Sequence, residues 1–491
     1  MVREWDVVLV GGGAAGCVLA SRLSDRADRS VLLLEAGPDF RSHLPEDVRD
    51  GKRPTFNHDW GYASEPNSDG TVLTLYRGKL LGGCSSTNAT FALRGHPADY
   101  DAWASEGNAG WSFADVLPYF CRLETDADFG SADWHGSDGP LPIRRYGDRE
   151  LTDVALAGLE TLEEGGFPLI ADANEPGAVG LACIPVNARA GERISTALAY
   201  LPHTEERSNL SVRSEAQVAE LILDGDRVTG VRLLSGEEIR APEVIVSAGA
   251  YASPALLMRS GIGPSAALSE LDIPVSVDLP GVGLNLIDHP AVSIDLPFDR
   301  AVEPVPVFQV AATSHSSGTR SDVAPDLHCM VGGPYEGNPA TFFLATALLK
   351  PHSRGSVTLR SADPTAPPRI DLGYYRASDD LDRIVEGLRR VRELAGVGAI
   401  KELSGGVDFG PGPEVDLRTW VRSRTWTYHH PVGTCAMGVD PSAGAVVDPA
   451  CRVHGISGLR VVDASIMPDI PSANTHIPTI MIAERVAALI N

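Results

Sequence analysis

The chain has 491 residues and a formal net charge of −24 at pH 7, with 43% hydrophobic and 22% charged residues. This length predicts more than one domain, because a single hydrophobic core stops growing at roughly 250–300 residues. The acidic excess argues against nucleic-acid and anionic-membrane partners, since both of those surfaces are negative. No uninterrupted apolar stretch reaches the ~18 residues that a membrane span needs, so we expect no such span.

The cysteines indicate a reducing compartment. Their number, seven, is odd, and no two of them have CxxC spacing. This pattern argues against a disulfide framework and against a cysteine-based zinc site. No targeting signal is visible, because acidic residues and glycines interrupt the apolar run near the N-terminus. We therefore expect a cytoplasmic protein and assign no metal site.

The chain opens with a β-α-β pattern, in which residues 14–25 have helical periodicity between two buried-strand runs. Gly11, Gly13 and Gly16 form G-x-G-x-x-G at the turn into the helix. In this context the glycines predict a dinucleotide site: they allow a tight turn, a close approach of the backbone to a pyrophosphate, and close helix–strand packing. The motif does not distinguish FAD from NAD.

Glu35 and the start of the helix complete this predicted site. The helix N-terminus carries a partial positive charge that favours phosphate. Glu35 ends the second strand, about 20 residues after the glycines, where a carboxylate can accept hydrogen bonds from a ribose diol.

The next part of the chain is less regular. Residues 40–110 are rich in Gly, Pro, Asn and Asp, which predicts long loops. Helical patterns follow at 113–124 and 151–166. The stretch 209–250 alternates apolar and polar residues around Asp-Gly and Ser-Gly turns, which predicts a small antiparallel sheet.

The second half of the chain alternates between α/β segments and irregular β segments. Its predicted elements are a buried strand at 243–249, a helix at 253–261, β segments at 308–314 and 325–333, a helix at 379–396, a strand at 458–465 and a helix at 478–490. The α/β segments thus lie at the start, middle and end, with irregular β segments between them. We expect an α/β fold (α+β overall), in which a sheet-plus-helices substrate domain is inserted into a discontinuous Rossmann-like domain.

The expected domain boundaries follow this alternation. Residues 1–150, 190–292 and 446–491 would form the nucleotide-binding domain. Residues 151–189 and 293–445 would form the substrate-binding domain.

Five segments narrow the identity of the chain: 76–103 ("YRGKLLGGCSSTNATFALRGHPADYDAW"), 249–264, 282–290 ("VGLNLIDHP"), 428–438 ("YHHPVGTCAMG") and 458–484. Together they resemble the glucose–methanol–choline (GMC) oxidoreductases from end to end. This resemblance implies FAD and the oxidation of alcohols. Thr87 stands where some relatives attach FAD covalently to a histidine, so we expect non-covalent FAD. The region 290–345 looks short for the family, which leaves the alcohol open.

The resemblance also implies cofactor contacts. The expected FAD-binding residues are Gly11, Gly13, Ala14, Ala15, Gly16, Glu35, Ala36, Trp60, Gly82, Gly83, Asn88, Ala89, Thr90, Phe91, Val218, His429, Asp463, Ala464, His476 and Thr479. Asp463 ends a strand, where α/β folds place ligands, and without the resemblance it could also cap a helix.

Alcohol oxidation by a flavin needs a base for the hydroxyl proton and transfer of a hydride to flavin N5. Histidine titrates in a suitable range for the base. The resemblance assigns this role to His430 of "HPVGT", and His476 is expected to orient the alcohol beside it. If the segment is extended, His429 points away from His430. Trp426, Phe308 and Phe343 are candidates for the wall of the substrate site.

Other functions remain open. A hydroxynitrile lyase could use the same FAD scaffold, an NAD-dependent dehydrogenase could use the same glycine motif, and a non-catalytic flavoprotein would share both. The electron acceptor is expected to be dioxygen or another carrier, since the motifs do not separate oxidases from dehydrogenases.

Overall fold

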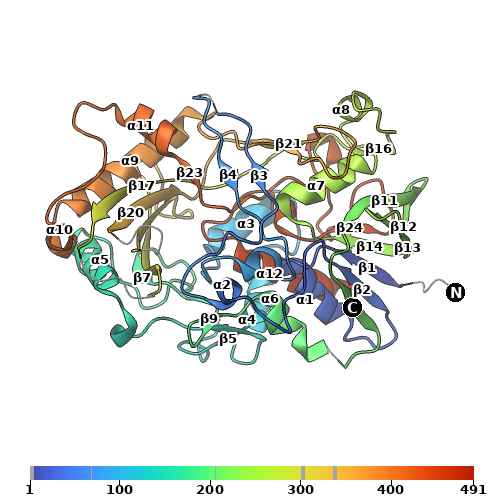
Figure 1. Cartoon of the computed structure of the whole chain (residues 1–491), viewed down its shortest axis with the longest axis horizontal. Coiled ribbons are helices and arrows are strands. Elements are labelled where there is room, and N and C mark those ends of the chain that lie inside the picture. Colours follow the sequence, from blue (N-terminus) through green and yellow to red (C-terminus); the bar gives the residue numbers. More distant parts are fainter. Residues whose placement is uncertain (1–4, 68, 205, 300–304, 335–339) are drawn as a thin grey trace.

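The computed structural model describes residues 5–67, 69–204, 206–299, 305–334 and 340–491. Residues 1–4 of the expected first domain, and part of the short 290–345 region, lie outside the described residues. Two large sheets occupy opposite ends of the longest axis of the molecule (Figure 1).

The first sheet is parallel and has the strand order β10 (Leu210–Arg213), β2 (Val31–Leu34), β1 (Val7–Val10), β14 (Glu243–Val246) and β24 (Leu459–Val461). Helices α1 (Ala14–Leu23) and α12 (His476–Ile490) pack against each other beside it. Strands from the start, middle and end of the chain thus share one sheet. This arrangement confirms the expected α/β fold with a discontinuous Rossmann-like unit.

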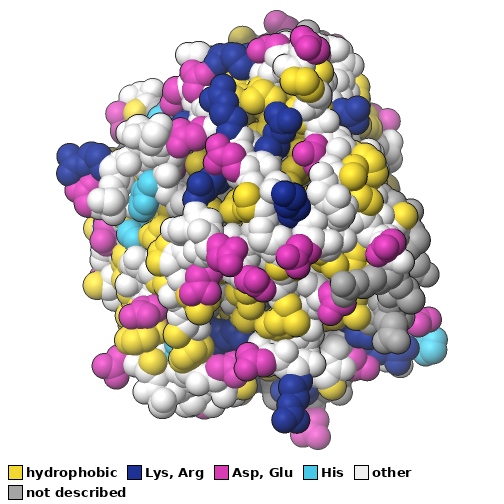
Figure 2. Space-filling model, turned by 90° about the vertical axis from the view of Figure 1, so that its left-hand side faces the viewer, with side chains coloured by type: hydrophobic (Ala, Val, Ile, Leu, Met, Phe, Trp, Pro, Cys, Tyr) yellow, Lys and Arg dark blue, Asp and Glu magenta, His cyan; other side chains and the backbone are white. Residues whose placement is uncertain are grey.

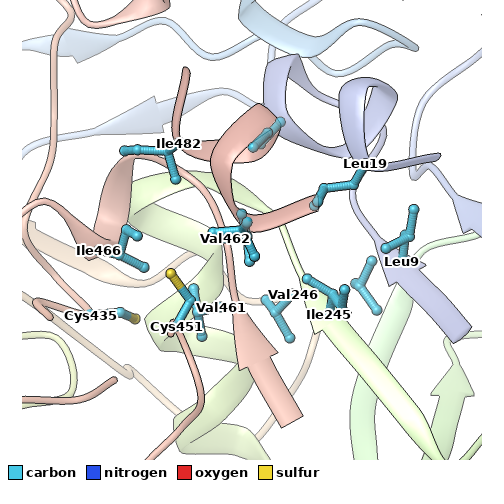
Figure 3. Close-up of a cluster of buried hydrophobic side chains, with 14 of the residues drawn as sticks. Leu9, Leu19, Ile245, Val246, Cys435, Cys451, Val461, Val462, Ile466 and Ile482 are labelled. Atoms are coloured by element: carbon cyan, nitrogen blue, oxygen red, sulfur yellow. The ribbon is translucent and has the colours of Figure 1, made fainter. Parts of the chain in front are cut away.

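A buried apolar core joins these distant segments. Figure 3 shows Leu9 of β1, Val246 of β14 and Val461 of β24 beside Leu19 of α1 and Ile482 of α12. Their exposed fractions are at most 5%. Parallel strands covered by helices read as continuous apolar runs, which is why the sequence pattern identified them correctly.

The stretch 209–250 contains the expected small antiparallel sheet. Its strands are β11 (Val218–Asp224), β12 (Arg227–Leu233) and β13 (Glu238–Arg240), paired in that order. The chain then returns through β14 and enters α7 (Gly249–Arg259).

The second large sheet has the order β23 (Trp426–Thr427), β17 (Pro290–Pro297), β20 (Thr341–Leu348), β19 (Leu327–Gly332), β18 (Phe308–Ser314) and β7 (Leu181–Cys183), with antiparallel neighbours throughout. Helices α5 (Asp153–Glu164) and α9 (Ser378–Ala395) cover one face, where residues such as Ile294 and Leu344 are buried. Residues on the other face, such as Ala291 and Phe343, belong to a separate apolar cluster that reaches the cavity described below.

We propose the two-domain division of the chain with one change. The expected boundary after residue 292 falls inside β17, which pairs with β20 from Ala291 onward. Because a strand belongs with its partners, the boundary is better placed before Pro290.

The region 40–110 differs from the expected loops because it contains α3 (Pro97–Ser105). The helix has a capping box: the His96 ring accepts the backbone N–H of Ala98, and Asp99 accepts that of His96 at 2.9 Å. Capping and Pro97 in the first turn, rather than apolar periodicity, start this helix.

The other elements are short or peripheral. They are α2 (Glu46–Arg49), α4 (Phe113–Leu123), α6 (Thr196–Tyr200), α8 (Ser265–Ser269), α10 (Gly398–Ser404), α11 (Leu417–Arg424), η1 (Gly83–Ser86), η2 (Asp148–Glu150), η3 (Pro202–Thr204), η4 (Pro441–Ala443), η5 (Ala464–Ile466), β3 (Tyr62–Ala63), β4 (Thr74–Leu75), β5 (Glu124–Asp126), β6 (Leu141–Ile143), β8 (Ala188–Arg189), β9 (Glu192–Arg193), β15 (Ile262–Gly263), β16 (Val277–Asp278), β21 (Ser356–Thr358) and β22 (Arg369–Asp371).

The face at the left-hand end of Figure 1 carries both signs of charge. Figure 2 shows acidic and basic side chains interspersed there with small apolar patches, so the negative net charge does not gather into one acidic surface on this face. Among the described residues, every helix is too short or too polar to cross a bilayer.

Candidate active site

A cavity of about 1190 Å³ lies between the two large sheets and is lined by residues of both. Pockets for one small molecule usually measure about 300–1,000 Å³, so this cavity has room for a dinucleotide together with a small substrate.

The glycine turn forms one end of the cavity. Gly11 has a φ of +102°, a left-handed conformation that favours glycine. A Cβ added to Gly16 would lie 1.9 Å from the Gly11 carbonyl oxygen, so only glycine lets the helix pack this closely. A Cβ on Gly13 would meet nothing within 4 Å and would point into open space. These positions match the tight turn, the close packing and the open approach that the motif predicts.

The loop of residues 82–91 packs against this turn. The Gly82 N–H donates to the Gly12 carbonyl at 2.7 Å, and a Cβ on Gly83 would lie 2.9 Å from the Gly13 Cα. Arg193, which is 1% exposed, donates from beneath to the carbonyls of Ser86 and Asn88, at 3.2 and 3.0 Å. A buried guanidinium therefore holds the shape of the loop.

Glu35 lies at the end of β2, as expected. Its carboxylate accepts the backbone N–H groups of Gly12 and Gly37, at 2.8 and 2.7 Å. Burial raises the pKa of Glu35 despite these hydrogen bonds. The carboxylate thus ties the glycine turn to the second strand at the place where a ribose would bind.

Most of the expected cofactor residues line the cavity: Gly11, Gly13, Ala14, Ala15, Glu35, Ala36, Trp60, Gly83, Asn88, Ala89, Phe91, Val218, His429, Asp463, Ala464, His476 and Thr479. Gly16, Gly82 and Thr90 do not line it and instead support its wall. Gly16 packs on Gly11, a Cβ on Gly82 would collide with the Ser86 hydroxyl, and Thr90 is 1% exposed behind Asn88.

His430 lies in the cavity wall, and both nitrogens of its ring have protein partners. Its Nε2 is 3.0 Å from Asn474 Nδ2, and its Nδ1 is 3.0 Å from His289 Nδ1. Neither ring nitrogen of His430 bonds His476. His476 also lines the cavity, and its expected role of orienting the alcohol stays a prediction. Asn474 lies in the loop two positions before His476, which is the first residue of α12.

The environment keeps the imidazole of His430 neutral. Burial lowers the pKa of His430 well below its usual value, and the nearby His289 and Arg77 lower it further. Burial likewise lowers the pKa of His476 to about 4. Neutral imidazoles can accept protons, which is what a base requires.

His429 does not alternate with His430 as an extended strand would require. Strand β23 ends at Thr427, and His429 has a φ of +65°. Both histidines consequently line the cavity. The His429 carbonyl accepts a hydrogen bond of 2.7 Å from Arg77 Nη2. Burial, and then the charge of Arg77, lower the pKa of His429 to about 3.

Aromatic rings form part of the cavity wall. Phe308 lies edge-on to Phe91 and Phe343, with ring centroids 5.3 and 5.8 Å apart. Trp426 lies edge-on to Tyr428, whose ring centroid is 4.3 Å from that of His430. The expected wall residues Trp426, Phe308 and Phe343 all line the cavity.

Several buried polar atoms of the cavity wall have no hydrogen-bond partner among the described residues. They are Ser247 Oγ, His429 Nδ1, Asn474 Oδ1 and His476 Nε2. Such atoms are costly unless a bound molecule satisfies them. Together with the open space at Gly13, they fit a polar cofactor and a hydroxyl-bearing substrate.

Asp463 caps a helix, as the alternative interpretation of this residue allows, and it also lines the cavity. Its carboxylate caps η5 through the Ser465 N–H and accepts from Gly249 N and Ser253 Oγ, at 2.8, 2.8 and 2.6 Å. It fastens the end of β24 to the start of α7.

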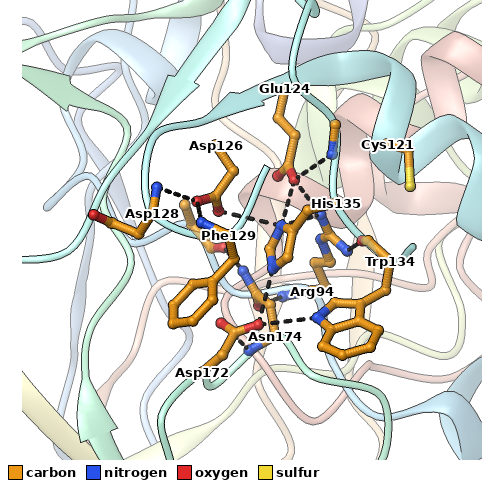
Figure 4. A network of polar contacts seen from close by, with 12 residues as sticks. Arg94, Cys121, Glu124, Asp126, Asp128, Phe129, Trp134, His135, Asp172 and Asn174 are labelled. Atoms are coloured by element: carbon orange, nitrogen blue, oxygen red, sulfur yellow. Dashed lines mark hydrogen bonds and ion pairs between the residues drawn. The ribbon is translucent and has the colours of Figure 1, made fainter. Parts of the chain in front are cut away.

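A cluster of charged side chains around another histidine, His135, lies outside the cavity. Figure 4 shows His135 between Glu124 and Asp172, with Arg94 beside Glu124. The His135 ring bonds Glu124 Oε1 at 2.6 Å and Asp172 Oδ2 at 2.8 Å, while Arg145 bonds both Asp126 and Asp172. Glu124, Asp126 and His135 could geometrically hold a metal ion. However, two arginines already neutralise these carboxylates, so the cluster is an ion-pair network.

Sequence reasoning missed three residues of the active site: Asn474, His289 and Arg77. Asn474 lies in the same "NTHIP" segment as His476, two positions earlier. His289 and Arg77 lie in segments that carried the family resemblance, and an imidazole and a guanidinium in such segments were a usable signal.

Comparison with known proteins identifies the family. Family profiles described as GMC oxidoreductase match residues 5–291 and 351–483. The chain is 38% identical to the 5-(hydroxymethyl)furfural oxidase of Methylovorus sp. (strain MP688), covering 98% of each chain. It is 37% identical to an oxygen-dependent choline dehydrogenase of Burkholderia multivorans (strain ATCC 17616 / 249), covering 99% of this chain and 93% of the relative.

A solved structure agrees in fold. The pyridoxine 4-oxidase from Mesorbium loti superposes with a TM-score of 0.91 at 30% identity, covering 99% of each chain. The match spans both sheets and the cavity between them, since almost the whole chain is covered. The chain is therefore a member of the GMC oxidoreductase family, an FAD-dependent enzyme that oxidises alcohols.

Proposed function

We propose that this enzyme oxidises a primary alcohol carried on a flat, largely apolar ring, with His430 as the base that takes the hydroxyl proton. The observation that carries the proposal is the position of His430 Nε2, next to Asn474 in the wall of an aromatic-lined cavity.

The side chains of the wall can perform the proton transfer. A buried neutral imidazole accepts the hydroxyl proton at Nε2, and such a base accelerates a reaction by about 10²–10⁴-fold. Asn474, within 3.0 Å of this nitrogen, is placed to orient the hydroxyl group. Bound FAD supplies the two-electron acceptor for the hydride that leaves the carbinol carbon.

The cofactor would bind along the glycine side of the cavity. We propose that Gly13 and Ala15 hold the pyrophosphate, Glu35 the ribose, and the loop around Asn88 the flavin. His476, at the N-terminus of α12, would face the flavin with its unsatisfied Nε2. Thr87 lines the cavity without an imidazole to attach FAD, which supports non-covalent binding.

The aromatic wall supports a ring-bearing substrate. The edge-on rings of Phe308, Phe91 and Phe343 present apolar surfaces. Such surfaces favour stacking of a substrate ring, whereas a sugar would need many hydrogen-bond partners. One relative is named for 5-(hydroxymethyl)furfural, a hydroxymethyl group on a furan ring. Another is named for choline, and the exposed Asp295, which also lines the cavity, could face such a cation.

We further propose dioxygen as the electron acceptor. The names of three relatives contain "oxidase" or "oxygen-dependent".

The test is anaerobic reduction of the FAD-loaded protein by a panel of alcohols: 5-(hydroxymethyl)furfural, benzyl alcohol, choline and glucose. We expect the first two to bleach the flavin and air to restore its colour with release of hydrogen peroxide. Bleaching by choline or glucose alone would overturn the substrate class. Cleavage of a cyanohydrin without bleaching would indicate the lyase, and a purified protein that releases no flavin on denaturation would favour an NAD enzyme.

A further inference from the structure

Asp288 and His289, at the entry to β17, contact the catalytic segment from behind. The His289 ring is completely buried, and its plane lies at 85° to that of His430, with centroids 5.2 Å apart. The contact joins the two Nδ1 atoms at 3.0 Å. A hydrogen bond between two neutral imidazoles needs one donor and one acceptor, so it links their tautomers.

The same dipeptide also holds the backbone of the catalytic segment. Asp288 Oδ1 accepts the backbone N–H groups of His430 and His289, each at 2.8 Å. The other carboxylate oxygen accepts the Thr427 hydroxyl, and the Tyr428 N–H donates to the His289 carbonyl at 3.0 Å. Asp288 therefore holds the backbone of His430 in place, and His289 contacts the His430 ring.

We propose that His289 is a positioning residue: its Nδ1 accepts the proton of His430 Nδ1 and so keeps His430 Nε2 unprotonated beside Asn474 in the cavity wall. This inference rests on the proposed function, because it assigns the tautomer that a base at Nε2 requires. The hydrogen bond made by one ring nitrogen decides which nitrogen carries the proton. A base oriented by a third group is a recurring feature of catalytic sites.

The other contact of His430 is consistent with this tautomer. Asn474 presents its Nδ2, an amide group that can only donate, to His430 Nε2. With the Asn474 amide in this orientation, Nε2 accepts and is unprotonated, and the single ring proton resides on Nδ1, facing His289. In the opposite arrangement His289 would donate, Nε2 would carry the proton, and His430 could not act as the base.

The charged and titratable neighbours disfavour an imidazolium on either ring. Burial and the nearby Lys350 and His328 lower the pKa of His289 to about 3, against the effects of the Leu349 carbonyl and Asp469. Besides burial, His289, Arg77, His429 and His328 all lower the pKa of His430. Two neutral rings sharing one proton between their Nδ1 atoms are the result.

The test compares His289→Leu with His289→Gln in the FAD-loaded enzyme, using whichever panel alcohol bleaches the wild type. Leucine offers no acceptor, whereas glutamine offers a carbonyl oxygen. We expect His289→Leu to lower kcat roughly 10- to 100-fold, as for other partners that fix the tautomer of a functional histidine, with KM little changed. The acidic limb of its kcat/KM profile should move to lower pH, because a protonated His430 would lose the acceptor of its Nδ1 proton.

His289→Gln should recover most of kcat. FAD absorbance and the thermal midpoint of each variant serve as folding controls. A His289→Leu enzyme that holds FAD and keeps the wild-type kcat and pH profile would overturn the inference. So would a His289→Gln enzyme as slow as His289→Leu, or loss of FAD in both, which would make the residue purely structural. A wild type that no alcohol reduces would refute the proposed function instead.

Discussion

Two of the buried histidines, His135 and His430, have polar surroundings that shift their pKa values in opposite directions. Burial disfavours the charged form of His135, but hydrogen bonds to Asp172 and Glu124 prevail and raise its pKa. At His430 burial acts in the same sense, and its neighbours are His289 and Arg77, so its pKa falls. Burial lowers the pKa of a buried imidazole, and carboxylate partners such as those of His135 can outweigh it.

The difference separates a stabilising network from a reactive site. When His135 is protonated, it joins Arg94 and Arg145 in balancing three buried carboxylates: Glu124, Asp126 and Asp172. The His430 site instead leaves polar atoms of its cavity wall unsatisfied. The His135 network also has two unpartnered atoms, Arg94 Nε and Arg145 Nε, but each of its three carboxylates is paired with a cation. The unpartnered atoms near His430 line a cavity that a ligand can enter.

The largest expected effect comes from removing the neutral histidine. His430→Ala should slow anaerobic flavin reduction by about 10²–10⁴-fold, because the variant lacks the proposed acceptor of the hydroxyl proton. FAD absorbance should persist, since the proposed cofactor contacts lie on other residues. Stopped-flow measurement of flavin bleaching checks this, and near-normal reduction in the variant would contradict the role of His430.

The charged cluster should respond in stability rather than in chemistry. Arg145→Met leaves Asp126 and Asp172 buried without one cation, and breaking such a pair costs about 3–5 kcal/mol of unfolding free energy. Denaturant unfolding measures the loss, and Arg149→Met, which changes an exposed arginine, is the matched control. The folded variant should reduce its flavin at the rate of the wild type. Slower flavin reduction in a variant of unchanged stability would contradict the assignment of this cluster to stability.

The two clusters should also differ in how stability depends on pH. A raised pKa at His135 contributes stability that is fully present below about pH 6.5, its ordinary value, and is lost as pH rises through the folded-state pKa. As pH rises through the folded-state pKa of His135, the thermal midpoint of the wild type should therefore decline more than that of His135→Gln. Parallel declines in a pH series of both proteins would show that His135 does not titrate as inferred.

The smallest expected effect is the pH response of catalysis. Because the pKa of His430 is lowered, this base stays unprotonated below pH 6.5, and kcat/KM should remain flat from pH 8 to about 6.5. The measurement is steady-state oxidation of the panel alcohol across this range, with FAD content checked at each pH. A loss of kcat/KM on the acidic side already near neutrality would mean that His430 binds a proton more readily than its surroundings imply.

Sequence patterns predicted the parts of the fold whose physics is local. A continuous apolar strand such as Val7–Val10 can be recognised without knowing its distant partners, and so can the glycine spacing that follows it. Both are found as expected. Helix α3 escaped prediction because a capping box, rather than an apolar stripe, starts it. Gly82 and Thr90 were expected to contact the cofactor but pack behind the cavity wall. Sequence spacing does not distinguish residues behind a wall from residues that line it.

The sequence by itself determined that the chain forms a dinucleotide-binding α/β unit and that His430 lies in a segment typical of alcohol-oxidising flavoenzymes. Only the tertiary structure decided what touches His430. Its partners Asn474 and His289 come from 44 positions later and 141 positions earlier in the chain. A hydrogen bond depends on atoms within about 3 Å, and spacing along a sequence cannot choose between Asn474 and His476 when a helix begins between them.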